Sequence, residues 1–529
     1  MSFDDLLQQL KNSKNLGLLS GIVRGIEKES LRVDRQGYLA STTHPKSLGA
    51  ALTHPSITTD FSEALLEFIT APASSIEAVL NELEEIHRFT YPQINDELLW
   101  VSSMPCQLRS DRDIPIGKYG TSNLGTMKKI YRMGLGHRYG RAMQTIAGIH
   151  YNFSVPDELW LLLKEIQQNK QSLQAFKSAG YLALIRNFRR YSWLLIYLLG
   201  AAPAVCRSFV AGRSHRLEPV DLDTHSLYTP YATSLRMGDL GYQSEAQSSL
   251  QISYNSLEQY IDSLRDALYQ PYAAYDKIGL KDPQGNYKQL NTHLLQIENE
   301  FYSTIRPKRT ALDGETPLQA LENRGVEYIE VRCLDVNPLI PCGIDATSIR
   351  FIDTFLMFCL LSESPASDIK ENQHISENLM RTVYNGRDPA LSLIEKHEEI
   401  AMSDWGSKLL GAMQPVAKLL DQAYAISTPD SQFEDALAYM QQRLVNPDTT
   451  PSAILLQEMK ENNETYFATA MRKTLQQRDY FLNKPLDSQT AAKYHELAEK
   501  SHDQQTEIEA ADTLTFDEFL SNYWQASLR

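Results

Sequence analysis

The pattern of apolar and polar positions changes character along the chain. Up to about residue 360, short runs rich in Ile, Val, Phe and Tyr recur, and several alternate polar with apolar residues, which is typical of β-strands. Stretches with helical periodicity lie between them, including residues 76–89 and 255–268. Strands and helices do not alternate strictly, so we predict an α+β fold with a largely antiparallel sheet. The predicted strands are residues 22–33, 63–70, 146–155, 294–302 and 326–334.

Beyond residue 360 the sequence predicts mainly helices. Residues 361–378 are polar and predict a loop or an excursion at the edge of a domain. Two later sets of apolar residues keep helical spacing: Leu409, Met413, Val416 and Leu420, and Phe467, Met471 and Leu475. We therefore predict a sheet-and-helix core over residues 1–360 and a mainly helical part over residues 361–529. The second part is expected to pack on the first as one continuous structural unit.

Neither the most apolar run of the chain nor its N-terminus predicts a membrane segment. The most apolar run, from Trp193, is too short to span a bilayer and contains Pro203, so it predicts a buried helix. The N-terminus is acidic and amphipathic, with Ser2 as a helix cap, and it lacks the basic region of a signal peptide.

Composition narrows the class of protein further. The formal net charge of −15 disfavours a nucleic-acid partner. The five cysteines contain no C-x-x-C pair, which argues against a disulfide framework or a thiolate zinc site and favours a cytoplasmic location.

Carboxylates interrupt the apolar face of the first predicted strand. Glu27 and Glu29 share that face with Val23, Leu31 and Val33. Other predicted strands carry polar residues in the same alternating way. These are His150, Asn152 and Ser154 in one strand, Gln296, Glu298, Glu300 and Tyr302 in another, Tyr328, Glu330 and Arg332 in a third, and Glu67 with nearby Asp60 at a fourth.

A sheet face with so many carboxylates requires cations, because burying an uncompensated carboxylate costs several kcal/mol. Mg²⁺ prefers carboxylate oxygen and binds substrate phosphates, so the pattern indicates a Mg²⁺–nucleotide site, although no Walker motif occurs. Other interpretations stay open. Glu27 and Glu29 could pair with Lys28 and Arg32, His150 could be a core histidine, and the cluster Arg306, Lys308 and Arg309 could line phosphates or form a surface turn.

At these segments the sequence resembles the proteobacterial glutamate–cysteine ligase (γ-glutamylcysteine synthetase) family. The resemblance covers about residues 18–345 and is thin beyond about residue 360. It is carried by the ordered strings RGIEKESLRV, ALTHPSITTDFSEALLEFIT, SSMPC, YGTSN, YRMGLGHRYG, MQTIAGIHYNFS, YATSLRMGDLGY, LQIENEFYSTIRPKR and GVEYIEVRCLDVNP.

The resemblance implies a catalytic core over residues 1–360 with a glutamine-synthetase-like fold, in which a curved sheet forms a funnel surrounded by helices. It implies Mg²⁺, with Mn²⁺ as an alternative, and ATP as substrate. Its metal-ligand positions match Glu27, Glu29, Asp60, Glu67, His150 and Glu330 in this sequence.

The same resemblance implies ligation of L-glutamate to L-cysteine through γ-glutamyl phosphate, the first step of glutathione synthesis, with feedback by glutathione. Arg332 matches a catalytic arginine at the transferred phosphoryl group, and Arg236 matches a residue that faces the amino-acid substrates. Tyr131, Tyr242 and Tyr302 match the wall of the cysteine site, and Arg132 adjoins it. Two rivals remain: a related ligase that uses another amine, and a metal-binding regulatory protein without turnover.

Overall fold

The fold is built on one seven-stranded antiparallel sheet. A computed structural model describes residues 2–105, 107–220, 225–241, 245–248, 250–312, 314–425 and 432–527. The strand order is β2 (Ile57–Thr59), β3 (Leu65–Ile69), β1 (Val23–Val33), β5 (Ile149–Ser154), β10 (Tyr328–Leu334) and β9 (Ile305–Lys308), and β4 (Leu98–Leu99) also pairs with β1. Every pairing in it is antiparallel, as predicted. The mixed α+β class is therefore confirmed.

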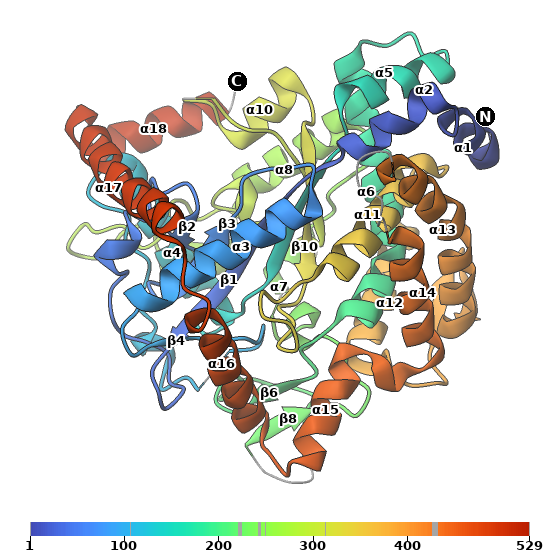
Figure 1. Cartoon of the computed structure of the whole chain (residues 1–529). Helices are drawn as coiled ribbons and strands as arrows, with labels where there is room; N and C mark the ends of the chain where they lie inside the picture. The colour runs from blue at the N-terminus through green and yellow to red at the C-terminus, as the bar shows by residue number, and fades with distance from the viewer. Residues whose placement is uncertain are drawn as a thin grey trace.

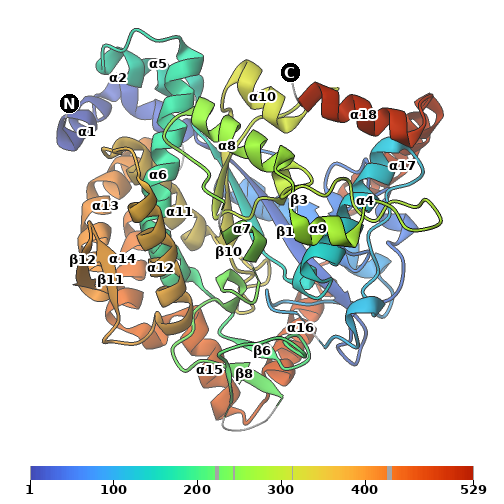
Figure 2. The same ribbon diagram turned by 180° about the vertical axis from the view of Figure 1, so that it is seen from behind.

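Helix α3 (Ile76–Thr90) covers one face of this sheet (Figure 1). Lys28 of β1 points to that face, where its Nζ lies 2.6 Å from His87 Nε2. Because side chains alternate along a strand, Glu27 and Glu29 face the opposite side. That side is approached by α4 (Asn123–Tyr139), α7 (Glu245–Ser248), α8 (Leu257–Tyr269) and α9 (Ala273–Ile278), as seen from behind in Figure 2.

The longest described helix, α6 (Leu173–Leu199), contains the first part of the apolar run that begins at Trp193, and residues 193–198 are buried. The prediction of a buried helix is confirmed for this part only, because the helix ends before Gly200 and the run continues through Pro203 outside it. It packs against α11 (Ala346–Leu361) and α12 (Ile369–Asn385). No described helix is long and apolar enough to cross a membrane. The N-terminal cap is confirmed as well, because Ser2 Oγ accepts from Asp5 N at the start of α1 (Phe3–Leu10).

Short elements complete the first part of the chain. They are α2 (Ser13–Leu16), α5 (Asp157–Ile166), α10 (Pro317–Arg324) and a three-stranded sheet of β6 (Ala204–Cys206), β8 (Ser226–Tyr228) and β7 (Glu218–Pro219).

In the described residues beyond 361, the regular elements are helices and one hairpin, β11 (Ser392–Glu395) and β12 (Glu398–Ala401). The helices that follow the hairpin are α13 (Met402–Tyr424), α14 (Phe433–Val445), α15 (Pro451–Glu461), α16 (Tyr466–Leu482), α17 (Ser488–Ala511) and α18 (Phe516–Ser527). The predicted helical residues Leu409, Met413, Val416 and Leu420 are buried in α13. One hydrophobic cluster runs from Leu7 and Ile26 to Leu410 and Phe481.

Two predicted segments are wrong. Residues 294–302 form no strand but contain a short 3₁₀ helix, Glu298–Glu300. The alternating pattern is misleading there because the Glu300 carboxylate accepts from Gln296 N at 2.6 Å, so the segment turns back on itself. The sheet strand is β9, just downstream. Residues 369–378 belong to α12 rather than to a loop, since Asp368 caps that helix at Glu371 N.

Candidate active site

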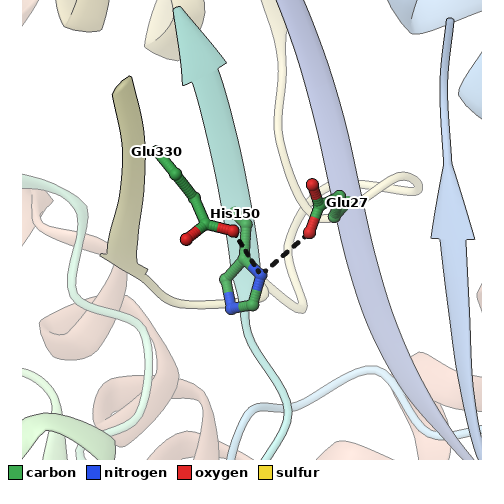
Figure 3. A group of neighbouring side chains, drawn as sticks. All are labelled: Glu27, His150 and Glu330. Atoms are coloured by element: carbon green, nitrogen blue, oxygen red, sulfur yellow. Dashed lines mark hydrogen bonds and ion pairs between the residues drawn. The ribbon is translucent and has the colours of Figure 1, made fainter. Parts of the chain in front are cut away.

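The sheet register brings the predicted acidic residues together. Glu27 of β1 lies opposite His150 of β5, and Glu29 lies opposite Glu67 of β3. Glu330 of β10 lies opposite Asn152, two residues from His150 on the same face of β5. Figure 3 shows the side chains of Glu27, His150 and Glu330 converging from three adjacent strands. Residues about 300 positions apart in sequence therefore share one patch of sheet.

These side chains form two groups that could each hold a metal ion. One group is Glu27, His150 and Glu330, and the other is Glu29, Glu67 and His150; within each, one ligand atom per residue lies within 4.8 Å of the others. His150 belongs to both. Its Nδ1 lies 3.2 Å from Glu27 and 3.9 Å from Glu330, and its Nε2 lies 3.8 Å from Glu29.

The electrostatics of the cluster favour a bound cation. Burial, reinforced by the neighbouring carboxylates, raises the pKa of Glu67 well above its usual value, and burial also raises the pKa of Glu29. The cluster therefore resists full ionisation without added positive charge. In addition, the buried Oδ1 of Asn152 has no hydrogen-bond partner. Oxygen-rich, partly neutralised donors of this kind fit a hard divalent ion such as Mg²⁺ or Mn²⁺.

For Glu330 and Glu27, in contrast, neighbouring groups lower the pKa and favour the ionised carboxylate. Burial disfavours ionisation of Glu330, but the cations Lys308 and Arg332 outweigh it and hold the pKa of Glu330 well below its usual value. Burial also opposes ionisation of Glu27, yet the hydrogen bond from His150 lowers the pKa of Glu27. The side chain of Glu330 is 2% exposed and that of Glu27 is 20% exposed, so the cluster opens to solvent near Glu27.

Asp60 and Arg132 lie at the β2 edge of this cluster. The Asp60 carbonyl accepts from Arg132 Nε and from Tyr119 OH. The Asp60 carboxylate is outside both groups of three, although its charge helps to raise the pKa of Glu67, after burial and Glu27. Arg132 extends from α4 over the Tyr119 ring, 4.4 Å from its centroid.

Two arginines border the cluster on the β10 side. Arg332 Nη1 lies 3.1 Å from Glu330 Oε2. Arg236, in a buried 3₁₀ turn, donates from Nη2 to the Arg332 carbonyl at 2.8 Å. Gly148 allows this approach, because a Cβ there would lie 2.0 Å from Arg236 Nη2. The Gly148 N–H also donates to Glu29 Oε2 at 2.6 Å, so one glycine contacts both the acidic cluster and an arginine.

The predicted tyrosines are partly described. Tyr302 lines a cavity of about 400 Å³ together with Met237, the neighbour of Arg236. Its hydroxyl accepts from Gln144 Nε2 at 3.0 Å, and its N–H donates to Gln247. Tyr131 packs in a small hydrophobic cluster around Met127, Ile130, Leu290 and Leu520 of α18. Tyr242 lies outside the described residues.

The alternative ion pairs from the sequence are not formed. Lys28 contacts His87, and Arg32 contacts Glu97 and the Glu63 carbonyl, both away from Glu27 and Glu29. The basic cluster is not a surface turn but lies in and next to β9. Of its members, Lys308 approaches Glu330 at 3.7 Å, whereas Arg306 donates to backbone carbonyls and Arg309 lies 3.8 Å from Glu327.

Sequence reasoning missed Gln144, Gln247 and Gly148 as neighbours of the predicted site. Gln144 lies in a 3₁₀ turn, Gln247 in the four-residue helix α7 and Gly148 in a loop, and segments this short have no periodicity that shows which way a side chain points. Only the string MQTIAGIHYNFS, which contains Gln144 and Gly148, carried a signal, through its match to the family.

Comparisons with known proteins agree with the resemblance. The family model described as glutamate-cysteine ligase matches residues 7–382. The glutamate–cysteine ligases of Alcanivorax borkumensis and Saccharophagus degradans are 49% and 50% identical, over 98% of this chain and 98% and 97% of their own lengths. A crystal structure of the Francisella tularensis glutamate–cysteine ligase in complex with AMP is 37% identical, with a TM-score of 0.89 over 96% of this chain and 98% of that one.

Proposed function

The chain belongs to the glutamate–cysteine ligase family, and we propose that it uses ATP to join the γ-carboxylate of L-glutamate to the amine of L-cysteine. The observation that carries the proposal is the buried cluster of Glu27, His150 and Glu330 with Arg332 beside it. The AMP bound to the Francisella relative supports a nucleotide substrate. The product, γ-glutamylcysteine, is the first intermediate of glutathione synthesis.

The reaction needs activation because a carboxylate is a poor acyl donor. The γ-carboxylate of glutamate attacks the γ-phosphorus of ATP, ADP leaves, and γ-glutamyl phosphate forms. The neutral amine of cysteine then attacks the acyl carbon, the amine loses a proton, and phosphate leaves. Both steps crowd anionic groups together, so catalysis consists mainly of positioning and charge neutralisation.

The acidic cluster would hold Mg²⁺ or Mn²⁺ through Glu27, Glu29, Glu67, His150 and Glu330, with Asp60 nearby. A bound ion would supply charge neutralisation at the ATP phosphates. The chain's own part is to hold five ligands on rigid strands. Glu27→Gln keeps the shape and removes one charge, so the Mg²⁺ concentration for half-maximal rate should rise while the fold is retained. An unchanged Mg²⁺ requirement would contradict this ligand role.

The arginines and tyrosines would bind the remaining substrate groups. Arg332, close to Glu330, would contact the transferred phosphoryl group, since a guanidinium matches its oxygens in bidentate fashion. Buried Arg236 would face the amino-acid substrates. Tyr131, Tyr242 and Tyr302 would form the wall of the cysteine site, with Arg132 adjoining it. Glutathione, which contains the same γ-glutamyl group, would compete for the glutamate site in the cytoplasm.

One experiment separates this function from its two rivals. ADP release is measured with ATP, Mg²⁺ and glutamate, adding L-cysteine, 2-aminobutyrate or ammonium in turn. We expect turnover with L-cysteine and slower turnover with 2-aminobutyrate. Turnover with ammonium alone would favour a ligase for another amine, and nucleotide binding without turnover would favour a regulatory protein.

A further inference from the structure

Two histidines outside the acidic cluster lie next to each other on the helical side of the molecule. His374 of α12 and His397 in the turn of the β11–β12 hairpin face each other, with their Nδ1 atoms 3.3 Å apart and their ring centroids 5.1 Å apart. Figure 2 shows the hairpin beside α12 on the helical side of the molecule. Neither histidine belongs to the groups around the sheet.

The spacing of these nitrogens fits a shared ion. Zinc binds histidine nitrogen at about 2.0–2.1 Å in tetrahedral geometry, which places two ligand nitrogens about 3.3–3.4 Å apart. The observed separation of 3.3 Å, which is that of an N–H···N hydrogen bond between the two rings in the absence of an ion, is close to that tetrahedral edge. We propose that His374 and His397 form a binding site for an imidazole-preferring divalent ion, with Zn²⁺ as the first candidate, which joins the hairpin to α12.

The surroundings supply space and negative charge. Both histidines line a cavity of about 450 Å³ whose wall also carries Glu363, Asp368, Glu371 and Glu395 against two cations, Arg190 and Lys396. Glu371 precedes His374 by three residues on α12, the spacing that puts two side chains on one helix face. It is held by Arg190 at 2.6 Å, so water, or a carboxylate that rotates, would complete the coordination.

The hairpin turn holds one ligand in an uncommon conformation. Lys396 and His397 have φ values of 49° and 73° between the paired residues Glu395 and Glu398. Positive φ at both positions is the geometry of a type I′ two-residue hairpin loop, which usually contains Asn and Gly. The turn of Lys396 and His397 thus brings an imidazole to α12 where glycine would bring no ligand.

The ligand chemistry distinguishes this site from the proposed catalytic one. Imidazole suits Zn²⁺, Co²⁺, Ni²⁺ and Cu²⁺, whereas Mg²⁺ prefers the oxygen ligands on the sheet. Excess Mg²⁺ should therefore fill the acidic cluster and leave the histidine pair available to Zn²⁺ or Co²⁺.

The test measures binding of Zn²⁺, and of Co²⁺ by its visible absorption, to the full chain in millimolar Mg²⁺. The variants are His374→Gln and His397→Gln, and the control is His495→Gln, an exposed histidine on α17. We expect one bound ion in the wild type and control, and affinity about tenfold or more weaker in each variant, because each loses one of two protein ligands. Melting curves check that the variants fold.

The proposal is overturned if both variants bind Zn²⁺ as tightly as the wild type, or if the wild type binds none in excess Mg²⁺. Retained binding in the variants that is lost in Glu27→Gln would assign the ion to the acidic cluster instead. Ligase turnover without Zn²⁺ is expected to be unchanged in both histidine variants, so this test and the test of the proposed function fail separately.

Discussion

Arg332 can act on the transferred phosphoryl group or pair with Glu330, and Arg332→Lys distinguishes these two roles. Lysine keeps the charge but loses the planar pair of donors. If Arg332 stabilises the transferred phosphoryl group, kcat should fall by about 10²-fold or more, corresponding to roughly 3–4 kcal/mol, with a smaller effect on ATP binding. If it only pairs with Glu330 at 3.1 Å, the melting temperature should fall instead.

Measuring kcat per folded molecule together with the melting temperature decides between these roles. Arg309→Lys is the matched control, because Arg309 lies just after β9 and faces Glu327 rather than the cluster. A lowered melting temperature with normal kcat would rule out the catalytic role.

Gly148 permits a close approach that alanine should block. A Cβ at this position would lie 2.0 Å from Arg236 Nη2 and 2.5 Å from its Cζ, and Arg236 is buried and has little room to shift. Overpacking of this kind lowers folding stability by about 1–3 kcal/mol. Because it also displaces Arg236, which is proposed to face the amino-acid substrates, kcat/KM for glutamate should fall about tenfold in Gly148→Ala, which corresponds to about 1.4 kcal/mol of transition-state stabilisation. The control is Gly411→Ala in α13, where a Cβ meets no atom within 4 Å, and it should leave kcat/KM for glutamate unchanged. Equal kinetics in the two variants would contradict the role of Gly148.

Single residues were predictable where periodicity fixes a direction. Glu27, Glu29, His150 and Glu330 alternate along strands, so their common face followed from the pattern once the strands were paired. Gly148 acts by having no side chain, and its neighbour Arg236 comes from a turn about 90 residues later. No local pattern encodes such a contact.

Elements were predictable except where polar side chains bond to their own backbone. Residues 294–302 alternate like a strand, yet Glu300 bonds to Gln296 N. Conversely, β9 was not predicted as a strand. It contains Pro307, and proline is unfavourable in most strands but is tolerated at a sheet edge, where β9 lies. Whether a segment pairs depends on its neighbours in space, which the sequence of the segment does not contain.

His54, a buried histidine just before β2, should make folding stability depend on pH. His54 Nδ1 accepts from Ser56 N and Ile57 N, and burial lowers the pKa of His54 to about 4. The unfolded chain gains this proton near pH 6.5, before the folded one does, so stability is fully present above that pH and falls as the pH drops toward 4. One such histidine accounts for about 1 kcal/mol between pH 7 and 5.5.

Urea unfolding at several pH values measures this dependence. His54→Asn keeps an acceptor oxygen but does not titrate, so its stability should change less with pH than that of the wild type. His495→Asn, at an exposed position, should leave the dependence unchanged. An equal pH dependence in His54→Asn and the wild type would show that His54 is not responsible.

At the scale of the whole molecule, we propose that residues 1–360 and 361–529 unfold together. Arg24 of β1 donates to Tyr424 OH at 2.7 Å and lies 2.8 Å from Asp353, and all three side chains are buried. Ala50 N donates to Ser501 Oγ at 2.8 Å. The sequence predicted a sheet-and-helix part and a helical part, but it did not predict these contacts, because each joins residues hundreds of positions apart.

The measurement is urea unfolding followed by circular dichroism and by tryptophan fluorescence. The two curves should coincide, and Tyr424→Phe should shift both equally, by about 1.5–3 kcal/mol, for the loss of a buried hydrogen bond to a charged group. Tyr439→Phe, at an exposed position in α14, is the control. Two separated transitions would mean that the parts fold independently.

The sharing of His150 between two ligand groups has a consequence for the order of loading. A neutral imidazole has one nitrogen with a free lone pair and one N–H, so it can serve as a ligand to only one of the groups at a time. The other nitrogen then donates toward the remaining carboxylates and orients them. The two groups therefore compete for the one lone pair of His150. The group that does not obtain it needs another ligand, and the carboxylate of Asp60 is the neighbouring donor that could supply one.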